Sequence, residues 1–219
     1  MKAIRRILSP LKNKAFKSLL LRQHDQFDFC SHAPVLLYLI KNFEIKNVCE
    51  SGSGYGSTPI LSDEILNPNL IKHNILETNP EWAKKINLLI SSKPASTIIE
   101  VNKPADFFLT SEIEFDLMFL DDSNTTTERA VSISAALKLL NDTNFLIIHD
   151  FEHKAYRRCI PDDVLLYEID SIKPFTGIVT KNTALNPEDI SKLNRLAKTN
   201  GRVQETVFWS DLLDNEFPK

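Results

Sequence analysis

The sequence predicts an α/β fold in which helices cover both faces of a seven-stranded, mostly parallel sheet. From residue 30 onward, short apolar runs rich in Val, Ile and Phe alternate with longer segments of helical period. This alternation is typical of strands joined by crossover helices. Apolar residues make up 42% of the 219-residue chain, which is enough for a large core. No repeat, low-complexity tract or glycine-serine linker divides the sequence, so we expect one main domain over residues 25–219.

The expected elements follow these runs in chain order. Strands are expected at 46–50, 71–77, 96–101, 115–120, 144–149, 164–169 and 176–181. Helices are expected at 32–43, 57–67, 80–91, 104–110, 126–140 and 187–199. Two of these helices begin with a capping asparagine, a proline at the first helical position and an acid in the first turn, namely Asn79-Pro80-Glu81 and Asn186-Pro187-Glu188.

Residues 1–24 form a basic segment that differs from the rest of the chain. They contain seven of the 26 Lys and Arg residues and none of the 29 Asp and Glu residues. The remaining 19 basic and 29 acidic residues give residues 25–219 a net charge of −10. Apolar residues of the basic segment recur at helical spacing, as at Ile4, Ile7 and Leu8. The alternatives are a helix packed on the domain edge, a surface for anionic lipid or an acidic partner, and a mitochondrial presequence.

Charge and cysteine content restrict the partners and the compartment. An acidic body disfavours nucleic acid as the main partner, because phosphate contacts require a positive surface. The three cysteines, Cys30, Cys49 and Cys159, form no CxxC pair, and no apolar signal-peptide core precedes them. This pattern argues against a secreted disulfide scaffold and against a zinc ribbon. We therefore expect a cytoplasmic protein. Residues 1–23 are the segment through which it could contact a membrane surface or an acidic partner.

Three of the five glycines lie within five residues, directly after the first expected strand. The segment reads Glu50-Ser51-Gly52-Ser53-Gly54-Tyr55-Gly56, and Ser57-Thr58-Pro59 then opens a helical stretch. Glycines at such a turn permit positive φ and let a ligand approach the backbone closely. A turn without a ligand is the plainer alternative, although one or two glycines suffice for it. A P-loop is excluded because no GK[ST] follows, and Ser57 stands where the dinucleotide fingerprint ends in Gly or Ala.

The glycine segment resembles the E/D-x-G-x-G-x-G loop of class I S-adenosylmethionine-dependent methyltransferases. The resemblance extends over about residues 30–181 and implies a Rossmann-like sheet that ends in an antiparallel pair. It implies that Glu50 helps to hold the ammonium group of S-adenosylmethionine. It also implies cofactor contacts along the loop at Gly52, Ser53, Gly54, Tyr55 and Gly56. An acidic site suits a cofactor that carries a positive sulfonium and no phosphate.

Glu77 ends the second expected strand, 25 residues after Gly52. An acid at this place in a Rossmann-like domain binds a ribose diol. We therefore expect Glu77 to bind the cofactor, although an acid here does not distinguish NAD from S-adenosylmethionine. An exposed acid ahead of the Asn79 cap is the alternative.

Acids and histidines follow the fourth and fifth expected strands, in FDLMFLDDSN and NFLIIHDFEH. Residues beyond the carboxyl ends of parallel strands face the ligand. We expect Asp121 at the cofactor, Asp122 and Asp150 as an acidic floor, and His149 or His153 as the base. His149 and Asp150 cannot both point into the site if the strand continues through them, because neighbouring strand side chains face opposite ways. A buried structural histidine and turn-capping carboxylates are the alternatives.

The pairing of DLMFLD with LIIHD resembles the small-molecule O-methyltransferase branch related to catechol and caffeoyl-coenzyme A methyltransferases. In that branch an acid after strand four and an Asp-Asn pair after strand five bind a divalent metal. Asp121 or Asp122 together with Asp150 offer oxygen ligands for Mg²⁺, but Phe151 stands in place of the asparagine. His153 as a substitute ligand would favour Mn, Fe or Zn. We therefore favour a metal-independent relative over a metal-bound site.

These patterns together predict an S-adenosylmethionine-dependent methyltransferase that acts on an oxygen atom of a small-molecule or glycan-like acceptor. An NAD-binding oxidoreductase is one alternative, which Ser57 and the lack of a Tyr-x-x-x-Lys pair weaken. A non-catalytic S-adenosylmethionine-binding or scaffolding protein, anchored by the basic segment, is the other. His24, His32 and His73 show no metal-ligand spacing and are expected to be structural.

Overall fold

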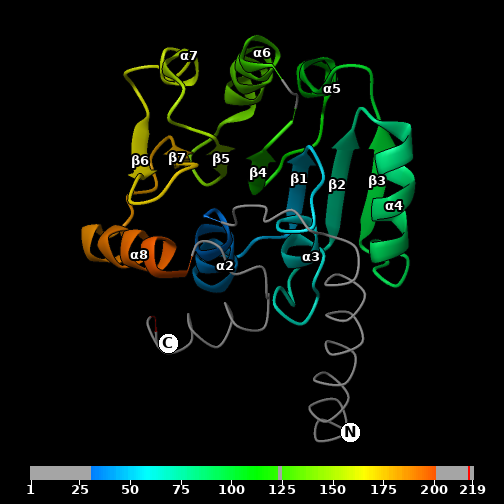
Figure 1. The fold of residues 1–219 in the computed structure, drawn as a ribbon, viewed down its shortest axis with the longest axis horizontal. Coiled ribbons are helices and arrows are strands. Elements are labelled where there is room, and N and C mark those ends of the chain that lie inside the picture. Colours follow the sequence, from blue (N-terminus) through cyan, green and yellow to red (C-terminus); the bar gives the residue numbers. More distant parts are fainter. Residues whose placement is uncertain (1–30, 123–124, 201–216, 218–219) are drawn as a thin grey trace, which may run out of the picture.

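Seven strands form one sheet in the order β3-β2-β1-β4-β5-β7-β6 (Figure 1). The computed structural model describes residues 31–122, 125–200 and 217. The strands are β1 (Asn47–Ser51), β2 (Lys72–Glu77), β3 (Ser96–Glu100), β4 (Leu117–Leu120), β5 (Phe145–His149), β6 (Leu165–Ile169) and β7 (Thr176–Thr180). β7 runs antiparallel to β5 and β6, and the other neighbouring strands are parallel. The predicted seven-stranded, mostly parallel sheet with an antiparallel final pair is confirmed.

Helices lie on both faces of this sheet. They are α2 (Ala33–Asn42), α3 (Thr58–Leu61), α4 (Pro80–Ile90), α5 (Pro104–Thr110), α6 (Thr126–Ala136), α7 (Lys154–Arg157) and α8 (Pro187–Asn200), and a 3₁₀ turn, η1 (Leu137–Leu139), follows α6. Figure 1 shows α5, α6 and α7 on one side of the sheet and α2, α3 and α8 on the other, with α4 beside β3. The chain therefore has the two-sided α/β architecture that its sequence predicts.

The alternation of strand side chains builds a separate core on each side of the sheet. On β4, Leu117 and Phe119 pack in the core that contains α2 and α8, whereas Met118 and Leu120 pack in the core that contains α5 and α6. All four side chains are fully buried. This alternation also decides on which side the residues just beyond each strand emerge.

Three elements differ from the sequence prediction, of which one is the short helix α7, which lies at none of the predicted positions. The helix expected at 57–67 is only the four-residue α3, because the Asp63 carboxylate accepts from the backbone N–H groups of Ile65 and Leu66 and turns the chain. The helix expected at 126–140 ends at Ala136 and continues as η1. The two predicted asparagine caps are confirmed. Asn79 accepts from the N–H groups of Glu81 and Trp82, and Asn186 accepts from that of Glu188.

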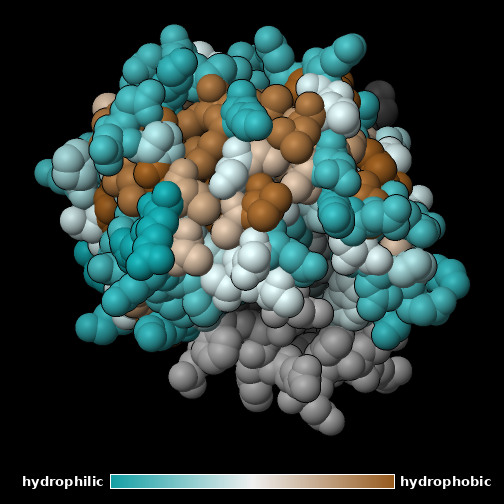
Figure 2. Space-filling model, turned by 90° about the horizontal axis from the view of Figure 1, so that it is seen from above, coloured by the Kyte–Doolittle hydropathy of each residue, from teal (hydrophilic) through white to brown (hydrophobic). Residues whose placement is uncertain are grey.

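Figure 2 views the molecule from the side of α5, α6 and α7, and it shows apolar residues gathered between hydrophilic ones. Leu109 of α5 and Val131 of α6 are more than half exposed. Among the described residues, no helix has both the length and the apolar character that crossing a bilayer requires. The basic segment 1–24 lies outside the described residues, so its separation from the main domain stays a prediction.

Candidate functional site

The glycine loop connects β1 to α3 and passes next to the end of β4. Gly52 has φ 85°, a conformation that favours glycine. A Cβ at Gly52 would lie 2.3 Å from the carbonyl oxygen of Asp121. The close approach at Gly52 is therefore made by the backbone beyond β4, and the predicted contact of Gly52 with the cofactor stays a prediction. A Cβ at Gly54 would meet nothing closer than the Ser57 hydroxyl at 3.5 Å, so Gly54 leaves room for a ligand.

Glu50 lies beneath the loop and is fully buried. Its Oε2 lies 3.2 Å from Nε2 of His73 on β2, and its other oxygen accepts from the Ser57 hydroxyl. Nδ1 of His73 lies 3.1 Å from the Ser62 hydroxyl. Glu50 thus ties the loop and the start of α3 to β2, while its predicted contact with an ammonium group stays a prediction. His73 has the structural role that the sequence predicts.

Glu77 lies at the end of β2, next to the glycine loop. Its Oε2 accepts from the N–H (3.2 Å) and the hydroxyl (2.6 Å) of Ser53, and its Oε1 accepts from the N–H groups of Thr78 and Asn79 at 2.9 Å. The Trp82 indole donates to the carbonyl of Ser53 at 2.8 Å. The Glu77 carboxylate therefore already accepts from a hydroxyl donor, as it would from a ribose diol.

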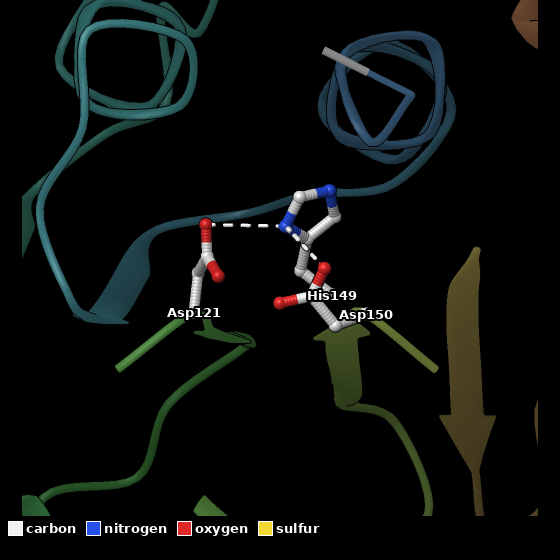
Figure 3. A group of neighbouring side chains, drawn as sticks. All are labelled: Asp121, His149 and Asp150. Carbon is white, nitrogen blue, oxygen red and sulfur yellow. Dashed lines mark ion pairs between the residues drawn. The ribbon is translucent and has the colours of Figure 1, made fainter. Parts of the chain in front are cut away.

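Asp121 and His149 come together at the ends of β4 and β5. Leu120 and Ile148 are register partners, so the next residue of each strand emerges on the same side of the sheet. Oδ2 of Asp121 lies 3.2 Å from Nδ1 of His149 (Figure 3). Asp122 emerges on the opposite side, is buried, and accepts from the Ser132 hydroxyl at 2.6 Å. The expectation that Asp122 shares an acidic floor with Asp150 is therefore wrong.

Asp150 joins the same cluster because β5 ends at His149. Asp150 has φ 57°, so the chain turns at this residue instead of continuing as a strand. Its Oδ1 lies 4.0 Å from Nδ1 of His149 (Figure 3). Both side chains therefore face the site, and the alternation that would separate them does not apply. The side chains of Asp121 and Asp150 are each about one-third exposed.

Arg129 completes the cluster, and the sequence reasoning missed it. It lies in the first turn of α6 and is 6% exposed. Its guanidinium lies 3.1 Å from Oδ1 of Asp121 and 2.7 Å from Oδ2 of Asp150, and its Nε donates to the carbonyl of Asp122 at 2.6 Å. A first helical turn disfavours a cation. An arginine there, close to two acidic strand ends, is the signal that was available in the sequence.

His32 also lies against the cluster, at the start of α2. It is buried, its ring centroid lies 4.7 Å from that of His149, and neither ring nitrogen has a hydrogen-bond partner among the described residues. Burial and the neighbouring His149 lower the pKa of His32 to about 3. His32 is thus a neutral ring in the wall of the site, a place that no sequence pattern predicted, and its structural role stays a prediction.

Burial and charge set the protonation of the cluster. Burial alone would raise the pKa of Asp121, but His149 and Arg129 beside it hold that pKa at about 2. Burial opposes protonation of His149, but Asp121 outweighs this effect and raises its pKa. Burial raises the pKa of Asp122 to about 6. Asp121 is thus a carboxylate that stabilises the protonated form of His149.

The residues do not fit a resident Mg²⁺ site of the type that the sequence resemblance suggests. Phe151, in place of the asparagine ligand, is fully buried. His153 is exposed at the start of α7, outside the cluster, so its predicted role as base or ligand finds no support in this geometry. One ligand atom each of Asp121, His149 and Asp150 lies within 4.8 Å of the others. Arg129, however, already pairs with both carboxylates.

Comparisons with known proteins support the fold. No protein-family model and no curated protein matches the sequence. Solved structures do match, and one of them is a putative caffeoyl-CoA O-methyltransferase from Staphylococcus aureus. The TM-score is 0.55 at 15% identity, and the match covers 78% of this chain and 99% of that one. The SAH-bound methyltransferase PaMTH1 from Podospora anserina matches with TM-score 0.55, 13% identity, and coverage of 69% and 80%.

TrmN from Thermus thermophilus matches with TM-score 0.55 and 14% identity over 68% of this chain, which spans about half (48%) of the TrmN chain. An rRNA methylase from Streptococcus thermophilus and a protein named as a putative rRNA methylase from Clostridium thermocellum are also similar in fold, at 13% and 12% identity. At these identities the likeness establishes the fold, which this chain shares with proteins named as methyltransferases of different acceptors.

Proposed function

We propose that this protein is an S-adenosylmethionine-dependent methyltransferase of a hydroxyl group on a small-molecule or glycan-like acceptor. The observation that carries the proposal is the meeting of the Gly52 turn, Glu77 and Asp121 at one edge of the sheet. The strand order reverses between β1 and β4, and such a switch point is where open α/β sheets bind ligands. The shared fold with an SAH-bound methyltransferase supports the same assignment.

The residues around this edge suit the cofactor. Glu77 would accept from the ribose hydroxyls, with Ser53 giving up its place on Oε2. The open backbone at Gly54 would lie against the amino-acid end of the cofactor. S-adenosylmethionine supplies a methyl group on a positive sulfonium, and the acids at the strand ends suit that charge.

His149 is the group that we assign as base. Asp121 orients the ring through Nδ1 and stabilises its protonated form. Because Nδ1 faces Asp121, the nitrogen that would take the proton is Nε2, which lies 3.5 Å from the Ser31 hydroxyl, so the acceptor hydroxyl would have to approach the ring from that side. Alignment of that hydroxyl with the methyl group is the protein's main contribution to an in-line displacement.

A small acceptor fits the charge better than RNA does. The 19 basic and 29 acidic residues between positions 25 and 219 leave a net −10, whereas RNA contacts require a positive surface. The rRNA methylases of similar fold make RNA the alternative acceptor.

Thermal unfolding with added ligands tests the cofactor. S-adenosylhomocysteine at 100 times its Kd should stabilise the fold by about 2.7 kcal/mol, and NAD should have no effect. Stabilisation by NAD alone would refute the proposal. Incubation with labelled methyl donor and either RNA or a small-molecule extract then tests the acceptor, and label in RNA would refute the small-acceptor assignment. Asp150→Ala should lower turnover, and unchanged turnover would remove Asp150 from the site.

A further inference from the structure

Arg129 and His149 lie on either side of the two partly exposed carboxylates, Asp121 and Asp150. Asp121 directs Oδ1 to the guanidinium at 3.1 Å and Oδ2 to Nδ1 of His149 at 3.2 Å. Asp150 directs Oδ2 to the guanidinium at 2.7 Å and Oδ1 towards the same Nδ1 at 4.0 Å. In each carboxylate, one oxygen thus pairs with the Arg129 guanidinium and the other faces the His149 imidazole.

The side chains of Asp121, His149 and Asp150 are arranged like the ligands of a metal ion. Two carboxylates and an imidazole are ligands that Mn²⁺ and Zn²⁺ accept, and their ligand atoms lie within 4.8 Å of one another. A guanidinium is always charged and presents several fixed donors to carboxylates. The positive charge that two neighbouring acids require therefore comes from the chain itself.

We propose that the Arg129 guanidinium takes the place of a divalent cation at this edge of the sheet, so that the site works without a metal and becomes a metal site only when Arg129 is removed. The part of this inference that concerns catalysis rests on the proposed function. Arg129 is a positioning residue, because it fixes Asp121 and Asp150 and binds the carbonyl of Asp122. It also repels any cation that approaches the cluster.

Binding of MnCl₂ by the full chain, followed by electron paramagnetic resonance, tests the proposal. Arg129→Ala should bind Mn²⁺ at least roughly tenfold more tightly than the unmodified protein, because a repelling charge is lost and both carboxylates are released. Arg129→Lys should show no such gain, since it keeps the charge. Asp150→Asn added to Arg129→Ala should remove the gain.

Arg157→Ala is the matched control. Arg157 lies on α7 and pairs with Glu168, so its loss changes the net charge equally without opening the cluster. Arg129→Gln serves if Arg129→Ala does not fold, since its amide can still donate to the carbonyl of Asp122. Folding of each variant is checked by circular dichroism.

Equal Mn²⁺ affinity in the unmodified protein and in folded Arg129→Ala would overturn the proposal. A loss of methyl transfer by the unmodified protein in EDTA, restored by Mn²⁺, would overturn it as well. The Mn²⁺ measurement requires no methyl donor. If S-adenosylhomocysteine fails to bind, the proposed function falls while the role of Arg129 is still decided.

Discussion

Replacement of Gly52 by alanine should destabilise the protein and weaken cofactor binding. Gly52 has φ 85°, and a Cβ there would lie 2.3 Å from the carbonyl oxygen of Asp121 and 2.6 Å from the backbone nitrogen of Asp122. Both atoms belong to the backbone, so a rotamer change cannot relieve the clash. The chain beyond β4 must move, and Asp121 moves with it.

The expected cost has two sources. Left-handed backbone in a residue with a Cβ costs about 1–2 kcal/mol, and overpacking at a rigid contact adds about 1–3 kcal/mol. We therefore expect Gly52→Ala to lower the free energy of unfolding by roughly 2–5 kcal/mol, a large part of the roughly 5–15 kcal/mol typical of folded domains.

Urea unfolding followed by circular dichroism measures this cost, and Gly54→Ala is the control. Gly54 does not have positive φ, and its Cβ would meet the Ser57 hydroxyl at an ordinary 3.5 Å. Gly54→Ala should therefore change the free energy of unfolding by less than about 1 kcal/mol. If Gly52→Ala costs no more than Gly54→Ala, the close contact between the loop and β4 does not exist as described.

Three further predictions concern the cofactor, the pH dependence and the basic segment. Glu77→Ala should weaken S-adenosylhomocysteine binding, measured by calorimetry, by about 10–100-fold. Glu100, the register partner of Glu77 on β3, is exposed, so Glu100→Ala should leave binding unchanged. Equal losses in the two variants would exclude a specific role for Glu77. The pKa of Asp122 is raised from 3.8 to about 6, so folding favours its protonated form and the free energy of unfolding should fall by about 3 kcal/mol as pH rises from below 4 to above 6. Asp122→Asn should remove this decline, which urea unfolding at pH 4 and pH 7 measures. The same decline in Asp122→Asn and in the unmodified protein would refute the prediction. Deletion of residues 1–23 should reduce sedimentation with anionic liposomes, and unchanged sedimentation would dismiss a membrane role.

Local patterns in the sequence were sufficient for the architecture. Strand and helix periodicity depend on neighbouring residues, so the order of the elements and the Asn79 cap follow from short segments. The length of α3 did not follow, because the Asp63 side chain competes with the helix for backbone N–H groups. The sheet edge at which the acids gather was also predictable, since the carboxyl ends of parallel strands share one edge.

The grouping of side chains at that edge depended on the tertiary structure. The register of β4 and β5 sends Asp121 towards His149 and Asp122 away from it, and no local pattern specifies that register. Arg129 reaches the cluster from a helix on the other side of the sheet. The sequence by itself therefore determined the fold, the glycine turn and the list of candidate acids. Which acids meet, and which cation balances them, was decided only by the packing of strands and helices that are distant along the chain.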